Sequence, residues 1–264
     1  MKTINTITII GGRGNFGSFI KKELEKIGFQ VNSILEDTDE NTKKNLLENS
    51  DVIIFSVPIR NTIDAIKNLV GINLKQNALV MDVTGIKTGI SEELKKLGTS
   101  EFVSIHPMFG PSIQSLNGKN IVITSSEKNT GKKWKILKRL LIKAGGELSN
   151  LSESEHDKKM AFVQATSHFL NLVFGNLLKN LGVNLDELNN LATPNFKGQE
   201  EIFLRILRGQ SGSTFADMEI ENPEFRNKVL PEIINSVKSL GEIVGSGDSK
   251  QFETMFGKLQ EKFL

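Results

Sequence analysis

One histidine lies where acid–base chemistry is expected. His106 belongs to the block Ile-His-Pro-Met-Phe-Gly-Pro at positions 105–111, and it directly follows residues 101–105, whose apolar pattern predicts a buried strand. The imidazole is therefore expected just past the carboxyl end of a strand, where open α/β sheets bind their ligands. Because the ordinary pKa of histidine is about 6.5, a ring held there is suited to act as a general base.

A glycine-rich motif near the start of the chain predicts a dinucleotide site beside this histidine. A β-branched run at 7–10 leads into the pattern G-x-G-x-x-G, and an amphipathic helix pattern follows as far as Gly28. Such glycines allow a tight turn and a close approach of the backbone to a pyrophosphate, whose charge is favoured at the helix N-terminus. The loop residues expected to bind the cofactor are Gly12, Arg13, Gly14, Asn15, Phe16 and Gly17.

Acidic residues at the end of the next predicted strand indicate which cofactor is bound. The strand at 29–35 ends at Glu36 and Asp37, about twenty residues beyond the glycines, as the fingerprint requires. A carboxylate at this place hydrogen-bonds a ribose 2′-hydroxyl and repels a 2′-phosphate, so Glu36 favours NAD over NADP. Arg13 argues the other way, since its guanidinium could reach a 2′-phosphate.

Composition and charge narrow the class of protein. With 264 residues the chain is long enough for two domains, and its net charge of +2 is too small to imply a nucleic-acid partner. The absence of cysteine excludes disulfides, a thiolate nucleophile and a cysteine-ligated metal. No apolar run is long enough to span a membrane, and Met1-Lys2-Thr3 leads into the first strand without a signal peptide, so a cytoplasmic location is expected.

Strand and helix patterns alternate until about residue 150 and then give way to helices alone. Alternation of this kind predicts a Rossmann-type, mainly parallel sheet covered by helices on both faces. The predicted strands are 7–10, 29–35, 51–55, 78–83, 101–105, 120–124 and 147–151. Helices are expected from 152 to about 181 and at 185–191, 198–207, 224–244 and 250–263. The sequence therefore predicts a dinucleotide-binding domain over residues 1–151 and an all-helical substrate and dimerisation domain over residues 152–264.

The first helix of the second domain carries a polar stripe. A capping box of Ser152 and Glu155 begins this helix, and apolar residues lie nearly all round it, which predicts that it is buried. Gln164, His168 and Asn171 interrupt the apolar surface at i, i+4 and i+7, so they share one face. Because buried polar groups need partners, the stripe either contacts neighbouring helices or lines a wet pocket.

The remaining histidine is not expected to join a common site with His168. On a regular helix, His156 lies about 18 Å from His168 along the axis and about 120° around it. A metal site made of the three histidines is therefore not expected. We interpret Glu155-His156-Asp157 as packing at the helix start.

Three cations are candidates for binding an anionic ligand. Arg205 lies among apolar residues at 202–207, so it is either a surface partner of Glu201 or a partly buried guanidinium that awaits a carboxylate. Lys197 lies in an expected loop and is a weaker candidate. Lys87 follows a predicted strand end and so lies on the ligand side of the sheet.

Together these motifs resemble the prephenate dehydrogenase family of tyrosine biosynthesis over essentially the whole chain. The matching blocks are 11–17, 56–59, 82–87, 106–111, 155–157, 160–162 and 168–169, and the His-Pro-Met-Phe-Gly-Pro block is the most specific of them. The resemblance implies a nucleotide-binding domain and a helical domain that pairs two subunits into a homodimer. It also implies NAD-dependent oxidative decarboxylation of prephenate to 4-hydroxyphenylpyruvate.

The resemblance also implies roles for individual residues. His106 matches the catalytic histidine, which accepts the proton of the ring hydroxyl as hydride leaves for the nicotinamide. Arg205 matches an arginine that holds a substrate carboxylate, and His168 and Gln164 match the wall of the substrate site. Ser56, Val57 and Pro58 match a block beside the cofactor.

Two departures from the family pattern leave the substrate open. Gly85 stands where many relatives have a serine, and Thr84 is expected to supply the missing hydroxyl. Lys197 stands where a relative has arginine, which exchanges a planar fork for a point charge at a substrate carboxylate. The alternatives are therefore an arogenate dehydrogenase or another NAD(P)-linked hydroxyacid dehydrogenase. An NAD-sensing domain without chemistry would explain the glycine loop but not His106 or Arg205.

Overall fold

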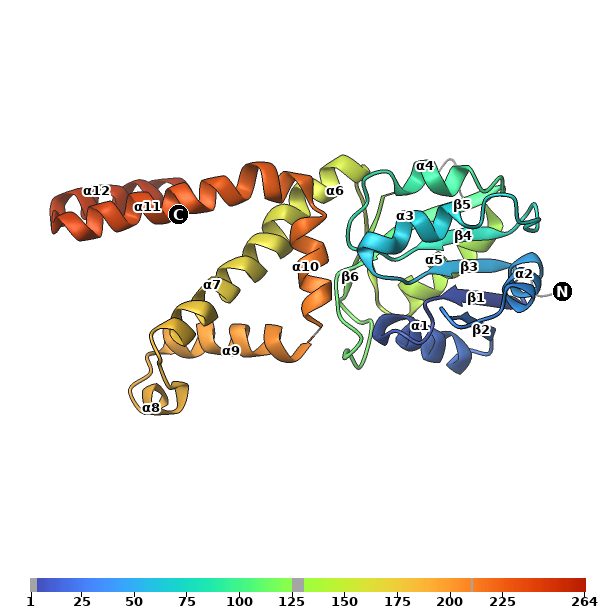
Figure 1. Ribbon diagram of the computed structural model, residues 1–264, viewed down its shortest axis with the longest axis horizontal. Helices are drawn as coiled ribbons and strands as arrows, with labels where there is room; N and C mark the ends of the chain where they lie inside the picture. Colours follow the sequence, from blue (N-terminus) through green and yellow to red (C-terminus); the bar gives the residue numbers. More distant parts are fainter. Residues whose placement is uncertain (1–3, 125–130, 210) are drawn as a thin grey trace.

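A mainly parallel sheet forms the first half of the chain in the computed structural model, which describes residues 4–124, 131–209 and 211–264 (Figure 1). Within these residues the sheet has seven strands in the order β2-β1-β3-β4-β5-β6-β7. They are β1 (Thr6–Ile10), β2 (Gln30–Ile34), β3 (Val52–Phe55), β4 (Leu79–Asp82), β5 (Glu101–Pro107), β6 (Asn120–Ile123) and β7 (Glu147–Asn150). Only the β5–β6 pairing is antiparallel. The segment Met1-Lys2-Thr3, interpreted above as leading into β1, lies outside the described residues.

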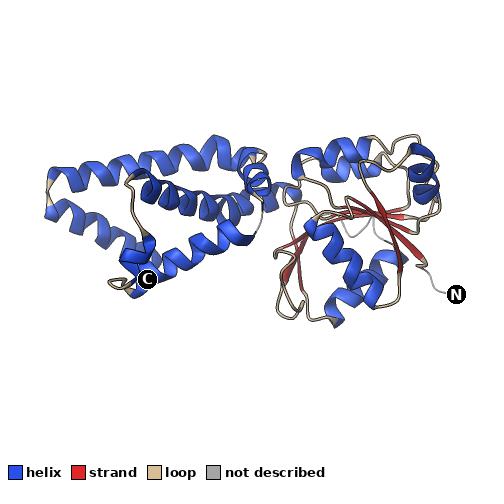
Figure 2. Cartoon of the chain, turned by 60° about the horizontal axis from the view of Figure 1, so that its bottom comes forward, coloured by secondary structure: helices blue, strands red, loops and turns tan. Residues whose placement is uncertain are grey.

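Helices cover both faces of the sheet (Figure 2). These helices are α1 (Asn15–Lys26), α2 (Glu40–Glu48), α3 (Ile59–Lys67), α4 (Ile90–Lys95) and α5 (Lys132–Lys143). On one face the strands pack against Ile20 of α1 and Trp134 of α5. On the other they pack against Leu47 of α2, Ile66 of α3 and Leu94 of α4. Because β3 is buried on both faces, its four residues are all apolar instead of alternating. The predicted Rossmann-type fold is confirmed.

The order of the strands locates the crevice for a ligand. β1 lies between β2 and β3, so successive crossovers lead to opposite edges of the sheet from β1. The loops after β1 and β3 diverge at this point, and open α/β sheets bind their ligands in the crevice outside such carboxyl ends.

The strand that carries His106 is longer than predicted. β5 pairs in parallel with β4 up to Ser104, and its last three residues pair antiparallel with β6, where His106 lies opposite Val122. The expectation that His106 lies just past the strand is therefore wrong by two residues. The added pairing with β6 holds the backbone of His106 as part of the sheet.

The second half of the chain is entirely helical and extends away from the sheet (Figure 1). Its elements are α6 (Glu153–Met160), a π-helix at Ala161–Thr166, α7 (Ser167–Asn180), α8 (Leu185–Asn189), α9 (Pro194–Gly209), α10 (Gly212–Ile220), a second π-helix at Phe225–Val229, α11 (Leu230–Ser246) and α12 (Ser249–Phe263). α11 and α12 form the outermost hairpin. Among the described residues, no helix has the combination of length and apolar character that crossing a membrane requires.

Several details of the helices differ from the prediction. The sequence patterns missed α2 and α10. The capping box of Ser152 and Glu155 is present at the start of α6, but the long helix that follows is widened into a π-helix at Ala161–Thr166. The prediction that this helix is buried is wrong for the single chain, because Phe162 and Val163 are each 61% exposed.

The two halves of the chain are joined by polar contacts that are largely buried. Asp157 of α6 accepts hydrogen bonds from the backbone of Lys87 and Thr88 in the loop between β4 and α4. Glu153 accepts another from the backbone of Ser91 at 2.8 Å. Arg60 of α3 pairs with Asp217 of α10 at 3.0 Å. The start of the helical domain is therefore fixed to the carboxyl end of the sheet.

Candidate active site

His106 is buried at the carboxyl end of β5, where Lys87 fixes the backbone beside it. The imidazole is 4% exposed. The fully buried Lys87 Nζ donates to the carbonyl of Ile105 at 2.6 Å and to Asp82 Oδ2 at 2.7 Å. Lys87 was expected on the ligand side of the sheet. Its ammonium instead holds together the ends of β4 and β5 and is not exposed to a ligand.

A second histidine contacts His106 directly. Nε2 of His156 lies 2.9 Å from Nδ1 of His106, and the two rings meet edge to face with centroids 5.1 Å apart. Nδ1 of His156 lies 2.7 Å from Asp157 Oδ1. Three side chains thus form a row that ends at His106, with its Nε2 directed toward Gly85.

The surroundings of His106 oppose a positive charge on its ring. Burial is the largest cause, and the neighbouring His156 and the Lys87 cation add to it, so the pKa of His106 lies well below its usual range. The pKa of Asp157 is also lowered, because hydrogen bonds from His156, Thr88 and Lys87 outweigh the effect of its burial. At neutral pH the row therefore holds an uncharged His106 and an ionised Asp157.

His106 faces a cavity of about 280 Å³ that it shares with several predicted cofactor residues. The cavity is lined by four segments at the carboxyl ends of strands: Gly14–Phe16, Ser56–Ile59, Val83–Gly85 and His106–Pro111 without Met108. The far wall comes from the helical domain, including Thr214 and Asp217 of α10. The buried imidazole and the glycine loop therefore face one cavity.

Thr84 and Gly85 lie in this cavity beside His106. Thr84 Oγ1 is buried and has no hydrogen-bond partner among the described residues. A Cβ atom at Gly85 would lie 3.5 Å from Nε2 of His106, an ordinary contact distance. An unpaired hydroxyl thus lies next to Gly85, where the family resemblance implies serine, and a polar ligand in the cavity would satisfy it.

The glycine loop after β1 has the shape that a pyrophosphate requires. Gly11 adopts a φ of +86°, and a Cβ there would collide with the carbonyl of Ser56. A Cβ at Gly17 would collide with the carbonyl of Gly11, so only glycine lets α1 start this close to β1. Gly12, Gly14, Asn15 and Phe16 lie between these two positions. The backbone thus leaves a cradle at the N-terminus of α1, which favours an anion.

A larger cavity, of about 1260 Å³, lies on the other side of the loop. Glu36 and Asp37 line it from the end of β2, together with Arg13 and with Ser56–Pro58. Arg13 pairs with Asp37 at 3.6 Å, and both side chains are more than two-thirds exposed. The acidic residues and the cradle fit a dinucleotide whose ribose lies near Glu36. Arg13 is engaged by a carboxylate instead of being free for a 2′-phosphate.

The three residues of the polar stripe have separate surroundings. Gln164 lies in the π-helix, and its Nε2 is 3.5 Å from Nε2 of His106. The ring of His168 packs edge to face on Phe215 of α10, with centroids 4.7 Å apart, and burial lowers its pKa. Asn171 accepts a hydrogen bond from Gln199 of α9 at 2.9 Å. Only Gln164 is therefore brought to His106, because the wider π-turn changes the angular spacing of the stripe.

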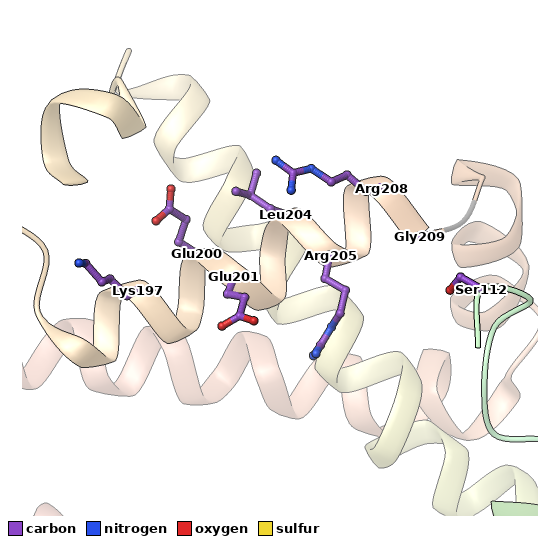
Figure 3. Close-up of a pocket in the computed structure, with 8 residues that line it drawn as sticks. All are labelled: Ser112, Lys197, Glu200, Glu201, Leu204, Arg205, Arg208 and Gly209. Atoms are coloured by element: carbon purple, nitrogen blue, oxygen red, sulfur yellow. The ribbon is translucent and has the colours of Figure 1, made fainter. Parts of the chain in front are cut away.

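Arg205 and Lys197 line a different cavity, of about 640 Å³ (Figure 3). Both side chains are exposed and belong to α9, so Lys197 lies in a helix instead of the expected loop. No ion pair joins Arg205 to Glu201 in the described part of the chain. Figure 3 shows the side chains of Arg205 and Arg208 extending from α9 in different directions. This cavity shares Gly209 with the cavity of His106.

Sequence reasoning missed two residues of the site. The segment Glu155-His156-Asp157 was interpreted as packing at the helix start, but His156 and Asp157 are in contact with His106 and with the loop after β4. The signal was their position in a block shared with the family. Within the described residues, no group of three or more histidine, aspartate or glutamate side chains is placed to hold a metal ion.

A Rossmann-type sheet that presents a glycine cradle and a buried histidine to one cavity, with a helical domain forming the far wall, defines a two-domain nucleotide-binding protein. Residues 20–150 match the family model of the prephenate dehydrogenase nucleotide-binding domain. Residues 152–258 match the model of the prephenate dehydrogenase dimerization domain. The chain belongs to the prephenate dehydrogenase family of NAD-dependent oxidoreductases, and the predicted resemblance is confirmed.

Curated relatives carry names for more than one substrate. The chain is 31% identical over 281 residues to a probable arogenate/prephenate dehydrogenase of Methanocaldococcus jannaschii, a match covering 100% of this chain and 62% of the relative. It is 30% identical over 227 residues to the T-protein of Haemophilus influenzae, covering 84% of this chain and 59% of that protein. The chain thus spans about six-tenths of the length of these two relatives.

Solved structures of the same fold bear both names as well. The prephenate dehydrogenase of Aquifex aeolicus, solved with hydroxyphenyl propionate and NAD+, aligns with a TM-score of 0.71 at 20% identity, covering 98% of this chain and 97% of that one. The arogenate dehydrogenase of Synechocystis aligns with a TM-score of 0.66 at 17% identity, covering 98% and 100%. At these identities the likeness concerns the fold alone.

Proposed function

We propose that this chain catalyses the NAD-dependent oxidative decarboxylation of prephenate to 4-hydroxyphenylpyruvate in tyrosine biosynthesis. The observation that carries the proposal is the uncharged imidazole of His106 in the cavity that the glycine loop also lines. An NAD-sensing domain would need the cradle but not a buried proton acceptor beside it.

The glycine loop and the residues after β2 and β3 would hold the cofactor. The cradle from Gly12 to Gly17 would hold the pyrophosphate, Glu36 a ribose hydroxyl, and Ser56–Pro58 the part that reaches the His106 cavity. NAD, when bound, supplies the acceptor for the hydride that leaves the ring carbon.

His106 would take the proton of the ring hydroxyl at Nε2. The hydroxyl oxygen then becomes a carbonyl, and the ring loses its carboxylate as carbon dioxide, whose bonding electrons complete the aromatic ring. The phenolate oxygen takes a proton back, so His106 returns to its uncharged state. A low pKa keeps the imidazole ready to accept, and general-base assistance of this kind contributes roughly 10²- to 10⁴-fold to a rate.

The other predicted residues would bind the substrate. Thr84 and Gln164 lie beside His106, and the unpaired hydroxyl of Thr84 suits a polar group of the ring. His168, Arg205 and Lys197 lie farther along the helical domain, and Arg205 is the proposed partner of a carboxylate. The point charge of Lys197 and the mixed names of the relatives make arogenate the second candidate substrate.

We also propose that the helical domain forms a homodimer. Large apolar side chains are exposed on α7, α11 and α12 of the single chain, including Val173, Leu177, Val237, Leu240 and Phe256. Soluble monomers rarely expose a continuous apolar surface of this kind. A second copy of the chain would cover it.

The proposed reaction is tested by following NADH absorbance with purified protein, NAD and either prephenate or arogenate. We expect NADH to form with prephenate. His106→Asn is expected to lower kcat by at least roughly 10²-fold while NAD still binds, because Asn keeps a polar group but not a base. Turnover with arogenate alone would support the second candidate. NAD binding without NADH formation from either compound would contradict the proposal.

A further inference from the structure

We propose that His156, held by Asp157, is a positioning residue that fixes His106 in the tautomer whose Nε2 carries no hydrogen. The inference rests on the proposed function, since it concerns how the base is kept able to accept a proton. It is argued from the hydrogen bonds along the row Asp157–His156–His106.

Asp157 determines where the hydrogen of His156 lies. Its ionised carboxylate has no hydrogen to donate. It accepts hydrogen bonds from four donors, which are the backbone N–H groups of Lys87 and Thr88, Thr88 Oγ1 and His156 Nδ1. Because an ionised carboxylate only accepts, the hydrogen of the 2.7 Å contact must be on Nδ1 of His156. In an uncharged ring, Nε2 of His156 is then an acceptor.

The hydrogen of His106 follows from that of His156. Since Nε2 of His156 can only accept, Nδ1 of His106 must donate across the 2.9 Å contact. Nε2 of His106 is left with a lone pair toward the cavity. The amide nitrogen of Gln164, which only donates, faces the same atom at 3.5 Å and agrees with this assignment. A mismatched tautomer would leave a buried donor facing another donor.

The glycine at position 85 makes contacts to the other nitrogen of the His106 ring, Nδ1, more important in this chain. A side chain at position 85 would contact Nε2 of His106, but glycine offers no hydroxyl there. The orientation of the ring is therefore set through its other nitrogen, by two residues of the helical domain that are almost fully buried. His156 and Asp157 act through His106 and do not line the cavity.

The tautomer assigned to His106 requires both rings to be uncharged, and charged groups surround the row. The groups are the cation of Lys87 and the carboxylates of Asp82, Asp157 and Glu153. One proton added to the histidine pair would place a hydrogen on both nitrogens of one ring and make Nε2 of His106 a donor.

Asp157→Asn tests the proposal because it should reverse the row. The backbone N–H and the hydroxyl of Thr88 both donate to Oδ2 of Asp157, and the N–H of Lys87 is shared between the two oxygens, so the amide oxygen is expected at the Oδ2 position. The amide nitrogen then faces Nδ1 of His156 and donates to it. His156 must carry its hydrogen on Nε2, and His106 must carry its hydrogen on the Nε2 that should accept. We expect kcat to fall by roughly 10²- to 10⁴-fold with little change in KM.

The tautomer is read directly from the ¹⁵N shifts of the imidazole rings, without any turnover. The chain has only three histidines, so His106→Asn, His156→Gln and His168→Asn assign every signal. Asp51→Asn is the matched control. Asp51 also accepts hydrogen bonds from two backbone N–H groups, those of Asn5 and Thr6, but it is distant from all three histidines in the sequence. It should change neither kcat nor the tautomer of His106.

Two variants of His156 keep the test decisive if Asp157→Asn does not fold. His156→Gln retains an acceptor for His106 and should preserve the tautomer and most of the rate, whereas His156→Phe removes the acceptor and should lose both. A hydrogen on Nε2 of His106 in the unmodified protein would overturn the inference, and so would an unchanged kcat in both His156→Phe and Asp157→Asn. A correct tautomer in a protein that oxidises neither compound would contradict the proposed function instead.

Discussion

The chemistry assigned to this chain depends on an imidazole whose neighbours all disfavour its protonation. His106 is buried, and His156 and Lys87 lower its pKa further. A base must be uncharged before it accepts a proton, so these contacts enlarge the pH range in which the enzyme is active. The lowered pKa also makes His106 a weaker base. This effect is offset if the proton of the ring hydroxyl moves to His106 together with the transfer of hydride to NAD.

We expect the acid limb of kcat/KM to lie below pH of about 6.5, the ordinary pKa of a free imidazole. The sign follows from the direction of the shift: a lowered pKa means that His106 loses its proton at a lower pH, so activity persists further into acid. The profile is measured with saturating NAD, because kcat/KM reports the titrating groups of the form that precedes substrate binding. An acid limb centred above pH of about 6.5 would show that His106 is not the titrating base.

The sequence could identify His106 but not its partners. The block at 105–111 is local, and its strand is recognised from five consecutive residues. The contact between His106 and His156 joins residues 50 positions apart, and it exists only because α6 packs against the loop after β4. Local patterns contain no information on that packing. The catalytic role of His106 and the substrate-binding roles of Thr84, Gln164, His168, Arg205 and Lys197 stay predictions.

At the scale of elements, the loop between β4 and α4 is held by a buried ion pair. Lys87 and Asp82 are both 0% exposed, and Lys87 also donates to the end of β5. Burial lowers the pKa of Lys87 and the carboxylate of Asp82 opposes that shift. Oδ2 of Asp82 also accepts from the backbone of Thr84. The pair therefore sets the shape of the loop that carries Thr84 and Gly85.

Lys87→Met is expected to lower the free energy of unfolding by about 3–5 kcal/mol, because it leaves the buried carboxylate of Asp82 without its cation. Urea unfolding followed by circular dichroism measures the loss. Lys75→Met is the control, since Lys75 is 36% exposed in its pair with Asp51 and should cost about 0–1 kcal/mol. Equal losses in the two variants would contradict the structural role assigned to Lys87.

The helix elements show where sequence patterns succeed and fail. The central strands and α1, α3 and α5 are predictable, because long apolar or amphipathic runs determine them. A π-turn such as Ala161–Thr166 has no periodic signature, and it accommodates one residue more per turn than the prediction assumed. As a result Gln164 and His168, expected on one face, lie against different neighbours.

At the scale of the whole molecule, the outer helices α11 and α12 leave apolar side chains exposed in a single chain. Ile234, Val237 and Val244 of α11 are each more than half exposed, as is Phe256 of α12. The sequence predicted helices over residues 224–244 and 250–263 within a dimerisation domain, but it did not say which of their faces a single chain leaves exposed. A pattern of hydrophobic residues indicates that a face is covered, but it does not say by which molecule.

Val237→Glu is expected to convert a dimer into a monomer, because it places a charge in the middle of the exposed apolar face of α11. Size-exclusion chromatography with light scattering measures the change in mass. Ser239→Glu, on the same helix but about 200° around it, should leave the mass unchanged. A monomeric unmodified protein would refute the proposed homodimer.

The hydrogen bonds between α6 and the loop after β4 have a consequence for building chimeric proteins from this family. The proposed base belongs to the sheet domain, while the residues proposed to orient it belong to the helical domain. Neither half is therefore a self-sufficient module, despite the clean change from strands to helices near residue 151. A chimera that exchanges the helical half would retain chemistry only if the donor brings its own equivalent of His156 and Asp157.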